Sequence, residues 1–410
     1  MFDIDIWQEI FSTIRKNKLR TFLTGFSVAW GIFMLIILLG SGKGLENGVK
    51  EEFKGDAVNS IWVYSGQTSE PYQGMQPGRR INFTNEDYVQ TKAKTTGVEH
   101  ISSRLHVGNS NVSYKNEYGS WSIITVHPGT KQLEEVEMQE GRFINEYDIQ
   151  QTRKSVVISY IVRDVLFKDT TKVLGEFINV SGVPFKVVGV FRDASDRDNR
   201  RVYLPVSTAQ KVYNRGNSIN NLAFTTGNLS GEESKIVEEE LRNQFARRHR
   251  FNPEDKRAIW IRNNVEEYER FQKLFSGIAL FIWIIGFGTI IAGVVGVSNI
   301  MIITVKERTK EIGIRKAIGA TPISIIGLIL LESIIIMATA GYIGLVAGIG
   351  LLELLAPQFQ ESGTFFKQPG VDIDIAIKAT ILLIGFGALA GLFPARKAAK
   401  IQPVVALRDE

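Results

Sequence analysis

The chain has 410 residues, of which 44% are hydrophobic and 22% are charged, and its formal net charge is +5. It contains no cysteine, which excludes a disulfide framework, a thiolate metal site and a cysteine nucleophile. The apolar residues are concentrated in four blocks, and much of the excess positive charge lies beside them. We therefore interpret the charge as an orientation signal in a membrane protein rather than as affinity for nucleic acid.

Residues 1–20 predict an amphipathic helix that lies flat on an anionic cytoplasmic surface. Its apolar face and its basic end consist of Trp7, Ile10, Phe11, Ile14, Arg15, Lys16, Lys18 and Arg20. A cleaved signal peptide would also place a basic stretch before an apolar run, but both stretches are too long here for that interpretation.

Residues 21–42 predict the first transmembrane span, because they carry no charge over a length that crosses roughly 30 Å of hydrocarbon. The sequence Gly-Ser-Gly-Lys-Gly at 40–44 predicts a flexible exit from the membrane. A phosphate-binding loop would need a glycine at position 37 and a serine or threonine at position 44, where this chain has Ile37 and Gly44. We therefore do not expect this chain to bind ATP.

Residues 43–272 have the composition of a folded domain outside the bilayer. Strands are expected at 61–64, 155–158, 222–226 and 259–261, helices at 160–168 and 232–248, and a hairpin at 176–180 and 185–191. This mixed order of strands and helices predicts an α+β domain.

The possible metal ligands of this domain do not have the spacing of a metal site. His106 and His127 lack acidic or histidine neighbours at ligand spacing, so we expect ordinary surface or core histidines. Asp193, Asp196 and Asp198 alternate with arginines, which favours a solvated loop with internal ion pairs over a calcium site.

The last third of the chain predicts three further spans. The expected segments are a second span at 273–305, a charged connection at 306–320, a third span at 322–352, an external loop at 353–370, a fourth span at 371–394 and a cytoplasmic tail at 395–410. The second span is longer than a crossing needs, which predicts tilt or protrusion. Its glycines, Gly286, Gly288, Gly293 and Gly296, permit close approach of another helix.

Glu332 lies about ten residues, or roughly 16 Å, past the start of the third span, where an ionised carboxylate is costly. A relay or substrate role is one interpretation of this intramembrane polar residue. We favour a protonated or hydrogen-bonded packing carboxylate, because no second buried charge is visible nearby in the sequence.

Lys and Arg residues orient the spans. The loop at 357–370 contains only Lys367, whereas the 306–320 segment contains five such residues and the tail four. Positive charge favours the cytoplasmic side, so both termini are expected in the cytoplasm and the α+β domain outside it.

The 306–320 segment predicts a short helix at the membrane surface. Glu311 follows Arg308 by three residues and precedes Arg315 by four, which is helical spacing. The alternatives are a docking face for another protein and a solvated run of charges beside the membrane. Gly313 and Gly319 are expected to let the chain bend back towards the bilayer.

Residues 307–320, Glu-Arg-Thr-Lys-Glu-Ile-Gly-Ile-Arg-Lys-Ala-Ile-Gly-Ala, resemble the signature of the MacB/FtsX family of ABC transporter permeases. Residues 141–143, 156–159, 188–193 and 202–205 resemble landmarks of the MacB-type periplasmic domain, and 395–408 resemble the family's basic C-terminal segment. The resemblance covers the whole chain. It implies four transmembrane helices plus a large extracytoplasmic α+β domain between spans one and two, with an inserted subdomain at about 65–140.

In this family the charged segment is the coupling helix that contacts an ATPase subunit. The resemblance assigns that role to Glu307, Arg308, Lys310, Glu311, Ile312, Gly313, Ile314, Arg315 and Lys316. We expect Glu307, Arg308, Glu311 and Arg315 to make its polar contacts, and Ile312 and Ile314 to fill the ATPase groove.

The implied protein is a non-catalytic permease of the bacterial inner membrane that exports a substrate by mechanotransmission. With no fused nucleotide-binding domain, it would depend on a separate ATPase subunit that holds ATP and Mg²⁺. A second permease copy, as homodimer or heterodimer, a periplasmic adaptor, an outer-membrane channel and lipids are the other implied partners. The same fold would also suit a lipoprotein-releasing permease or an FtsX-like signalling subunit that controls a cell-wall hydrolase.

Overall fold

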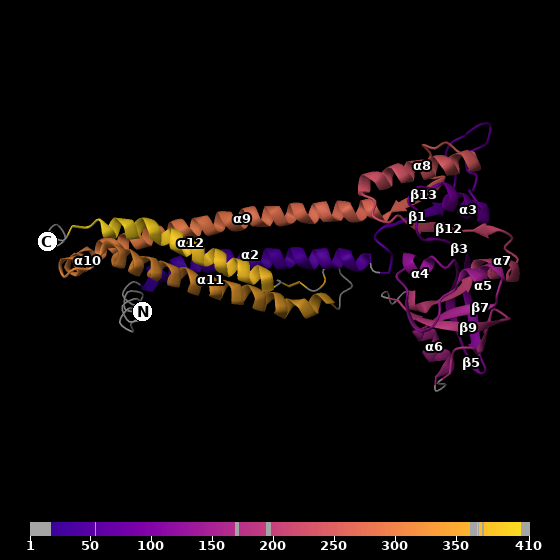
Figure 1. The fold of residues 1–410 in the computed structure, drawn as a ribbon, viewed down its shortest axis with the longest axis horizontal. Coiled ribbons are helices and arrows are strands. Elements are labelled where there is room, and N and C mark those ends of the chain that lie inside the picture. The colour runs from indigo at the N-terminus through magenta and orange to yellow at the C-terminus, as the bar shows by residue number, and fades with distance from the viewer. Residues whose placement is uncertain are drawn as a thin grey trace. The chain divides into compact units, whose positions relative to one another are not determined.

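The computed structural model describes residues 18–53, 55–168, 172–193, 198–360, 367, 369–370 and 373–402. The chain forms two compact units, one made of 1–51 with 273–410 and the other of 52–272 (Figure 1). We call them the helical unit and the α+β domain. An amphipathic helix was expected at 1–20, and residues 1–17 of it lie outside the described residues.

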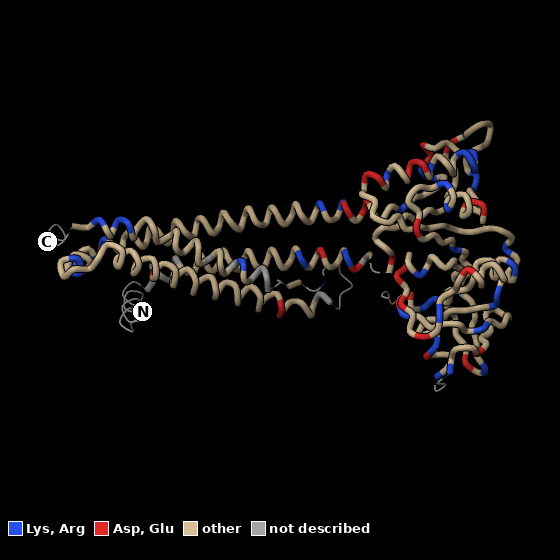
Figure 2. The backbone as a smooth tube through the Cα atoms, in the orientation of Figure 1, with Lys and Arg blue, Asp and Glu red and all other residues tan. Residues whose placement is uncertain are grey.

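Within the described residues, the helical unit has four helices that are long and apolar enough to cross a membrane. They are α2 (Lys18–Glu52), α9 (Asn264–Glu307), α11 (Pro322–Gln360) and α12 (Ile373–Ala399), and a short helix, α10 (Thr309–Ala317), lies between α9 and α11. Long stretches of α9 and α11 carry no charge (Figure 2). Four apolar helices, with an α+β domain between the first and the second, confirm the predicted fold class.

The helices extend beyond the apolar runs from which the spans were predicted. The flexible exit expected at 40–44 is wrong, because these residues lie inside α2. Ion pairs at helical spacing continue this helix into polar sequence, with Glu46 Oε2 at 3.4 Å from Lys43 Nζ and Glu46 Oε1 at 2.6 Å from Lys50 Nζ. Similarly, α11 extends to Gln360 within the expected external loop, and α12 to Ala399 within the expected tail.

Glycines set how closely the long helices approach. A Cβ atom built on Gly344 of α11 would lie 2.2 Å from the carbonyl oxygen of Ala29 in α2, and one on Gly348 would lie 2.8 Å from Ile36. These glycines are four residues apart, which is the spacing of close helix packing in membranes. On α9, Gly286 and Gly293 face α2, whereas Gly288 has no neighbour within 4 Å.

In the described residues of the α+β domain, the strands form two principal sheets. The four-stranded sheet has the order β13-β1-β12-β3 and the seven-stranded sheet the order β6-β9-β7-β10-β5-β4-β8. The strands of the first are β1 (Ser60–Ser65), β3 (Ile101–Arg104), β12 (Asn221–Thr225) and β13 (Ile259–Asn263). Those of the second are β4 (His106–Tyr114), β5 (Glu117–Val126), β6 (Glu137–Gly141), β7 (Ser155–Ser159), β8 (Phe177–Val180), β9 (Val183–Arg192) and β10 (Arg201–Pro205). β2 (Phe83–Thr84) pairs with β11 (Ser218–Ile219).

Short helices accompany these sheets. They are α3 (Asn85–Lys94), α4 (Thr130–Leu133), α5 (Glu146–Gln150), α6 (Tyr160–Phe167), α7 (Val206–Val212) and α8 (Gly231–His249), with a 3₁₀ turn at Asp198–Arg200. α8 begins with a capping box of Ser230 and Glu233 and covers the four-stranded sheet. Its buried residues Val237, Leu241 and Phe245 recur at four-residue steps, so they form one apolar face.

The sheet topology divides the domain differently from the inserted subdomain expected at about 65–140. Residues 60–104 supply β1 and β3 of the four-stranded sheet, whereas the strands described between 106 and 205 belong to the seven-stranded sheet. The inserted portion is therefore the seven-stranded sheet with its helices. Its parallel pairs, β7 with β9 and β10 with β5, join segments that are far apart in the sequence.

A buried ion network joins the two sheets. Glu134, which is 1% exposed, pairs with Arg104 at the end of β3 and with Arg201 in β10, where Glu134 Oε2 and Arg201 Nη1 are 3.1 Å apart. Tyr203 also donates to Glu134, at 2.8 Å. The guanidinium of Arg104 lies 4.3 Å from the ring centroid of Trp62 in β1. Because buried charges are tolerated when they are paired, this network fixes one sheet against the other.

Candidate functional site

The charged segment at 306–320 forms a helix between two bends. The first bend is at Arg308, whose φ of −98° and ψ of 13° separate α9 from α10. The Thr309 hydroxyl donates to the carbonyl oxygens of Val305 at 3.2 Å and Lys306 at 2.8 Å, which satisfies groups exposed by the break. The predicted short helix is therefore present, directly after the last turn of α9.

The second bend is at Gly319, whose φ of +109° favours glycine. The Ala320 amide donates to the carbonyl oxygen of Arg315 at 2.9 Å, closing the end of α10, and Pro322 then begins α11. Gly313, also expected to permit a bend, instead lies buried inside α10. The prediction of a bend is thus right for Gly319 and wrong for Gly313.

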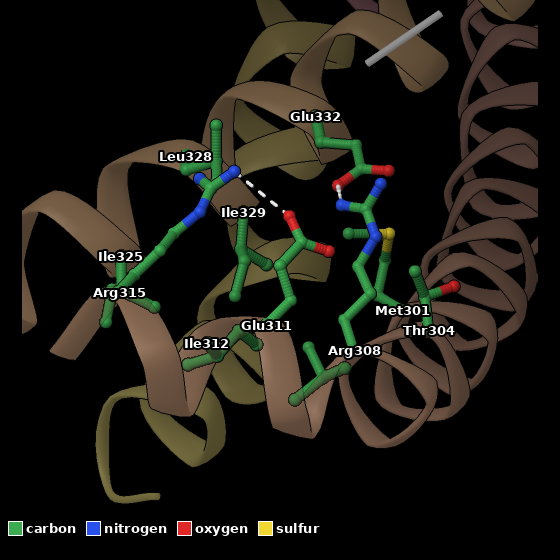
Figure 3. Close-up of a pocket in the computed structure, with 11 residues that line it drawn as sticks. Met301, Thr304, Arg308, Glu311, Ile312, Arg315, Ile325, Leu328, Ile329 and Glu332 are labelled. Carbon is green, nitrogen blue, oxygen red and sulfur yellow. Dashed lines mark hydrogen bonds and ion pairs between the residues drawn. The ribbon is translucent and has the colours of Figure 1, made fainter. Parts of the chain in front are cut away.

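One face of α10 is turned into the helical unit. Ile312 is buried in the same apolar cluster as Met301, Ile325 and Ile329. These side chains help to line a small cavity of about 20 Å³ (Figure 3). The expectation that Ile312 fills a groove of an ATPase is therefore wrong for this conformation, because the side chain already fills the chain's own core.

Arg308 and Glu332 meet at this cavity. Arg308 Nη1 lies 3.6 Å from Glu332 Oε2, and the two side chains are 20% and 4% exposed (Figure 3). No second charge was visible near Glu332 in the sequence, but the fold places the Arg308 guanidinium beside it. Arg308 belongs to the 306–320 segment and Glu332 to α11, so the fold of that segment is what brings them together.

The C-terminal half of α10 is bound to the end of α12. Lys316 Nζ donates to the carbonyl oxygens of Ala399 at 2.8 Å and Ile401 at 2.7 Å. A cation at a helix C-terminus satisfies exposed carbonyl groups and complements the helix dipole. Sequence reasoning placed Lys316 among the ATPase contacts and missed this role, although a lysine and a helix end are a known pairing.

The opposite face of α10 is exposed. It consists of Lys310, Glu311, Ile314 and Ala317 of α10 together with the flanking Glu307 and Ile318, and these residues recur at three- and four-residue steps. We call this set the exposed face. Ile314 and Ile318 are 43% and 82% exposed, and Glu311 pairs with Arg315 at 3.0 Å. Of the predicted site residues, Arg308, Ile312, Gly313 and Lys316 thus contribute to internal contacts, and Ile318 is an exposed residue that the prediction omitted.

Of the possible metal ligands in the α+β domain, His127 and Asp198 have structural partners. The ring of His127 stacks on that of Tyr88 at 4.0 Å, and its Nδ1 accepts from the Ser103 amide at 3.2 Å. Asp198 pairs with Arg201, while Asp196 lies outside the described residues. No group of three His, Cys, Asp or Glu residues in the described parts of the chain could hold a metal ion.

Most of the chain matches two known protein families. Residues 21–244 match the MacB-like periplasmic core domain, and residues 283–403 match the FtsX-like permease C-terminal domain. The second match includes the whole of α10 and both of its bends.

Full-length relatives cover almost the whole chain. It is 29% identical to an uncharacterised ABC transporter permease, YvrN of Bacillus subtilis, over 98% of each protein. It is 26% identical to the macrolide export ATP-binding/permease protein MacB of Bdellovibrio bacteriovorus, over 98% of this chain. The chain spans 61% of that relative's length.

Among solved structures, the periplasmic region of MacB from Actinobacillus actinomycetemcomitans is similar at 19% identity and a TM-score of 0.44. That match covers 56% of this chain and 98% of the other. The extracellular domain of the transporter YknZ from Gram-positive bacteria matches with 20% identity and a TM-score of 0.42, over 50% of this chain and 100% of that domain.

Proposed function

Because the chain belongs to the family of MacB-like and FtsX-like ABC transporter permeases, we propose that it transmits the motion of a separate ATPase to its own α+β domain. The exposed face of α10 is the observation that carries this proposal. It presents charges of both signs beside two exposed isoleucines on a helix that is anchored on its other side. An apolar centre with a polar rim is the usual composition of a protein interface.

A continuous helix supports the mechanical part of the proposal. α9 begins at Asn264, directly after β13 of the α+β domain, and ends at Glu307, one residue before the first bend. An unbroken helix transmits displacement along its axis better than a jointed one. Movement of α10 on ATP binding would therefore reach the α+β domain through the chain itself.

The proposed orientation places α10 and both termini in the cytoplasm of a bacterial cell, and the α+β domain outside the inner membrane. The five Lys and Arg residues of 306–320 support it. Relatives are named for the export of macrolides and, in PvdT of Pseudomonas savastanoi, of pyoverdine. We accordingly propose efflux, by a dimer of permeases bound to an ATPase that supplies ATP and Mg²⁺, together with a periplasmic adaptor and an outer-membrane channel.

The test replaces Ile314 by aspartate in the full chain and measures the affinity of the ATPase subunit that co-purifies with it. Burying an unpaired charge in the interface is expected to weaken binding at least tenfold, or about 1.4 kcal/mol. Ile236→Asp is the matched control, because Ile236 is an exposed isoleucine on α8 of the other unit. Equal affinity of the two variants for the ATPase would exclude the exposed face as the docking surface.

A further inference from the structure

The contact between Arg308 and Glu332 joins two functional parts of the helical unit. Arg308 is the residue at the bend where α10 starts, and Glu332 belongs to α11. The contact therefore ties the beginning of the proposed coupling helix to a transmembrane helix other than the one that precedes it. Nothing in the membrane-crossing role of α11 by itself requires a carboxylate at this position.

Burial distinguishes the Arg308–Glu332 contact from an ordinary surface ion pair. Glu332 is buried, and an ionised carboxylate in such a place is stable only with a partner. The Glu311–Arg315 pair differs, because both side chains are well exposed and both belong to α10. Exposed pairs at this spacing contribute little. The buried pair between helices is therefore the one able to hold α10 in place.

The same helix has a second attachment at its other end. Lys316 binds the carbonyl oxygens at the end of α12, and Ile312 fills the core between the two attachments. The residues of the exposed face remain open to solvent beside these contacts. A force applied to that face would consequently be passed to α11 and α12 as well as along the chain to α9.

We propose that Arg308 and Glu332 are positioning residues that fix α10 to α11, so that α11 moves with α10 when the ATPase acts. This inference rests on the proposed function for its source of force. The joint itself, which is the Arg308–Glu332 ion pair, exists in the chain without an ATPase. Loss of this ion pair should leave the exposed face intact. The ATPase should then still bind, but its motion should no longer reach α11.

The experiment begins with the chain alone in lipid nanodiscs. Because the sequence has no cysteine, spin labels can be attached specifically at Ile318→Cys, directly after α10, and at Ile343→Cys on α11, both exposed sites. Arg308→Gln and Glu332→Gln are expected to broaden the distance distribution between the labels at least twofold. The swapped pair, Arg308→Glu with Glu332→Arg, is expected to restore a narrower distribution, which a general packing defect would not allow.

The matched control is Glu353→Gln, which makes the same change at an exposed position of α11 and should leave the distribution unchanged. Should either single variant fail to fold, the swapped pair and Glu332→Asp provide the same comparison. Distributions in Arg308→Gln and Glu332→Gln as narrow as in the wild type would overturn the inference.

The second measurement uses the unlabelled chain bound to its ATPase. Glu332→Gln should keep the ATPase affinity and the KM for ATP within threefold, while the permease-dependent increase in kcat falls at least fivefold. A parallel loss of affinity would contradict a role in transmission. If the wild-type chain binds no ATPase but the labels still report the joint, the proposed function fails and the joint remains.

Discussion

At the scale of single residues, His127 shows how the α+β domain fixes a protonation state. Burial lowers the pKa of His127 to about 4, and the Ser103 amide donates to its Nδ1. The neutral ring stacks on Tyr88. The sequence could identify His127 as a residue without metal-ligand spacing, but its burial depends on a partner in α3, which spacing along the chain does not reveal.

This residue predicts a pH dependence of stability. The unfolded chain binds a proton at His127 near pH 6.5, whereas the folded domain does so only near pH 4. The contribution of His127 to the free energy of unfolding should therefore be fully present above pH 6.5. The free energy of unfolding should fall by about 3 kcal/mol as the pH drops to 4. Hydrogen exchange of the β3 and β5 amides in the full chain measures it.

The control compares two histidines. His127→Gln should flatten the decrease between pH 6.5 and 4, whereas His100→Gln, at an exposed position, should leave the decrease as it is in the wild type. Identical slopes in the wild type and His127→Gln would show that this histidine does not contribute to the acid sensitivity of the domain.

At the scale of elements, the packing of α11 against α2 depends on one backbone contact. Gly344 leaves no room for a side chain, because an added Cβ would lie 2.2 Å from the Ala29 oxygen. Gly344→Ala should thus destabilise the helical unit by about 1–3 kcal/mol. Gly350→Ala, on the same helix with nothing within 4 Å, should be neutral or slightly stabilising, since alanine favours helix.

Thermal unfolding of the two variants in the same detergent provides the measurement. Gly344→Ala should lower the unfolding temperature and Gly350→Ala should not, a difference that a general effect of alanine on α11 would not produce. A Gly344→Ala variant as stable as Gly350→Ala would mean that α2 and α11 do not pack through this glycine.

The helices also show how far the sequence predicts structure. Apolar runs locate the four spans because hydrophobicity is a local property, and the bend at Gly319 follows from one residue. The length of α2 was underestimated, since helical ion pairs at Glu46 carry it beyond the apolar run. The inward orientation of Ile312 and the Arg308–Glu332 contact depend on how three helices meet, so periodicity within the 306–320 segment could not establish them.

At the scale of the whole molecule, the α+β domain illustrates the same limit. Local strand patterns predicted β7 and β9 and the α+β class of the domain, but the division between the sheets depends on which strands pair. The parallel pairing of β10 with β5 and the buried network around Glu134 are contacts between distant parts of the chain. The expected boundary at 65–140 therefore failed where the prediction of an α+β domain succeeded.

The central claim is that the action of an ATPase at α10 reaches the α+β domain. Single-molecule energy transfer tests it directly, with one dye at Trp260→Cys, an exposed site on β13, and the other at Ile343→Cys on α11, in nanodiscs with the ATPase bound. We expect a non-hydrolysable ATP analogue to shift the distribution of distances between the dyes, and Ile314→Asp to abolish the shift. A distance distribution that the analogue leaves unchanged, in a complex whose bound ATPase is shown to turn over ATP, would contradict transmission through this chain.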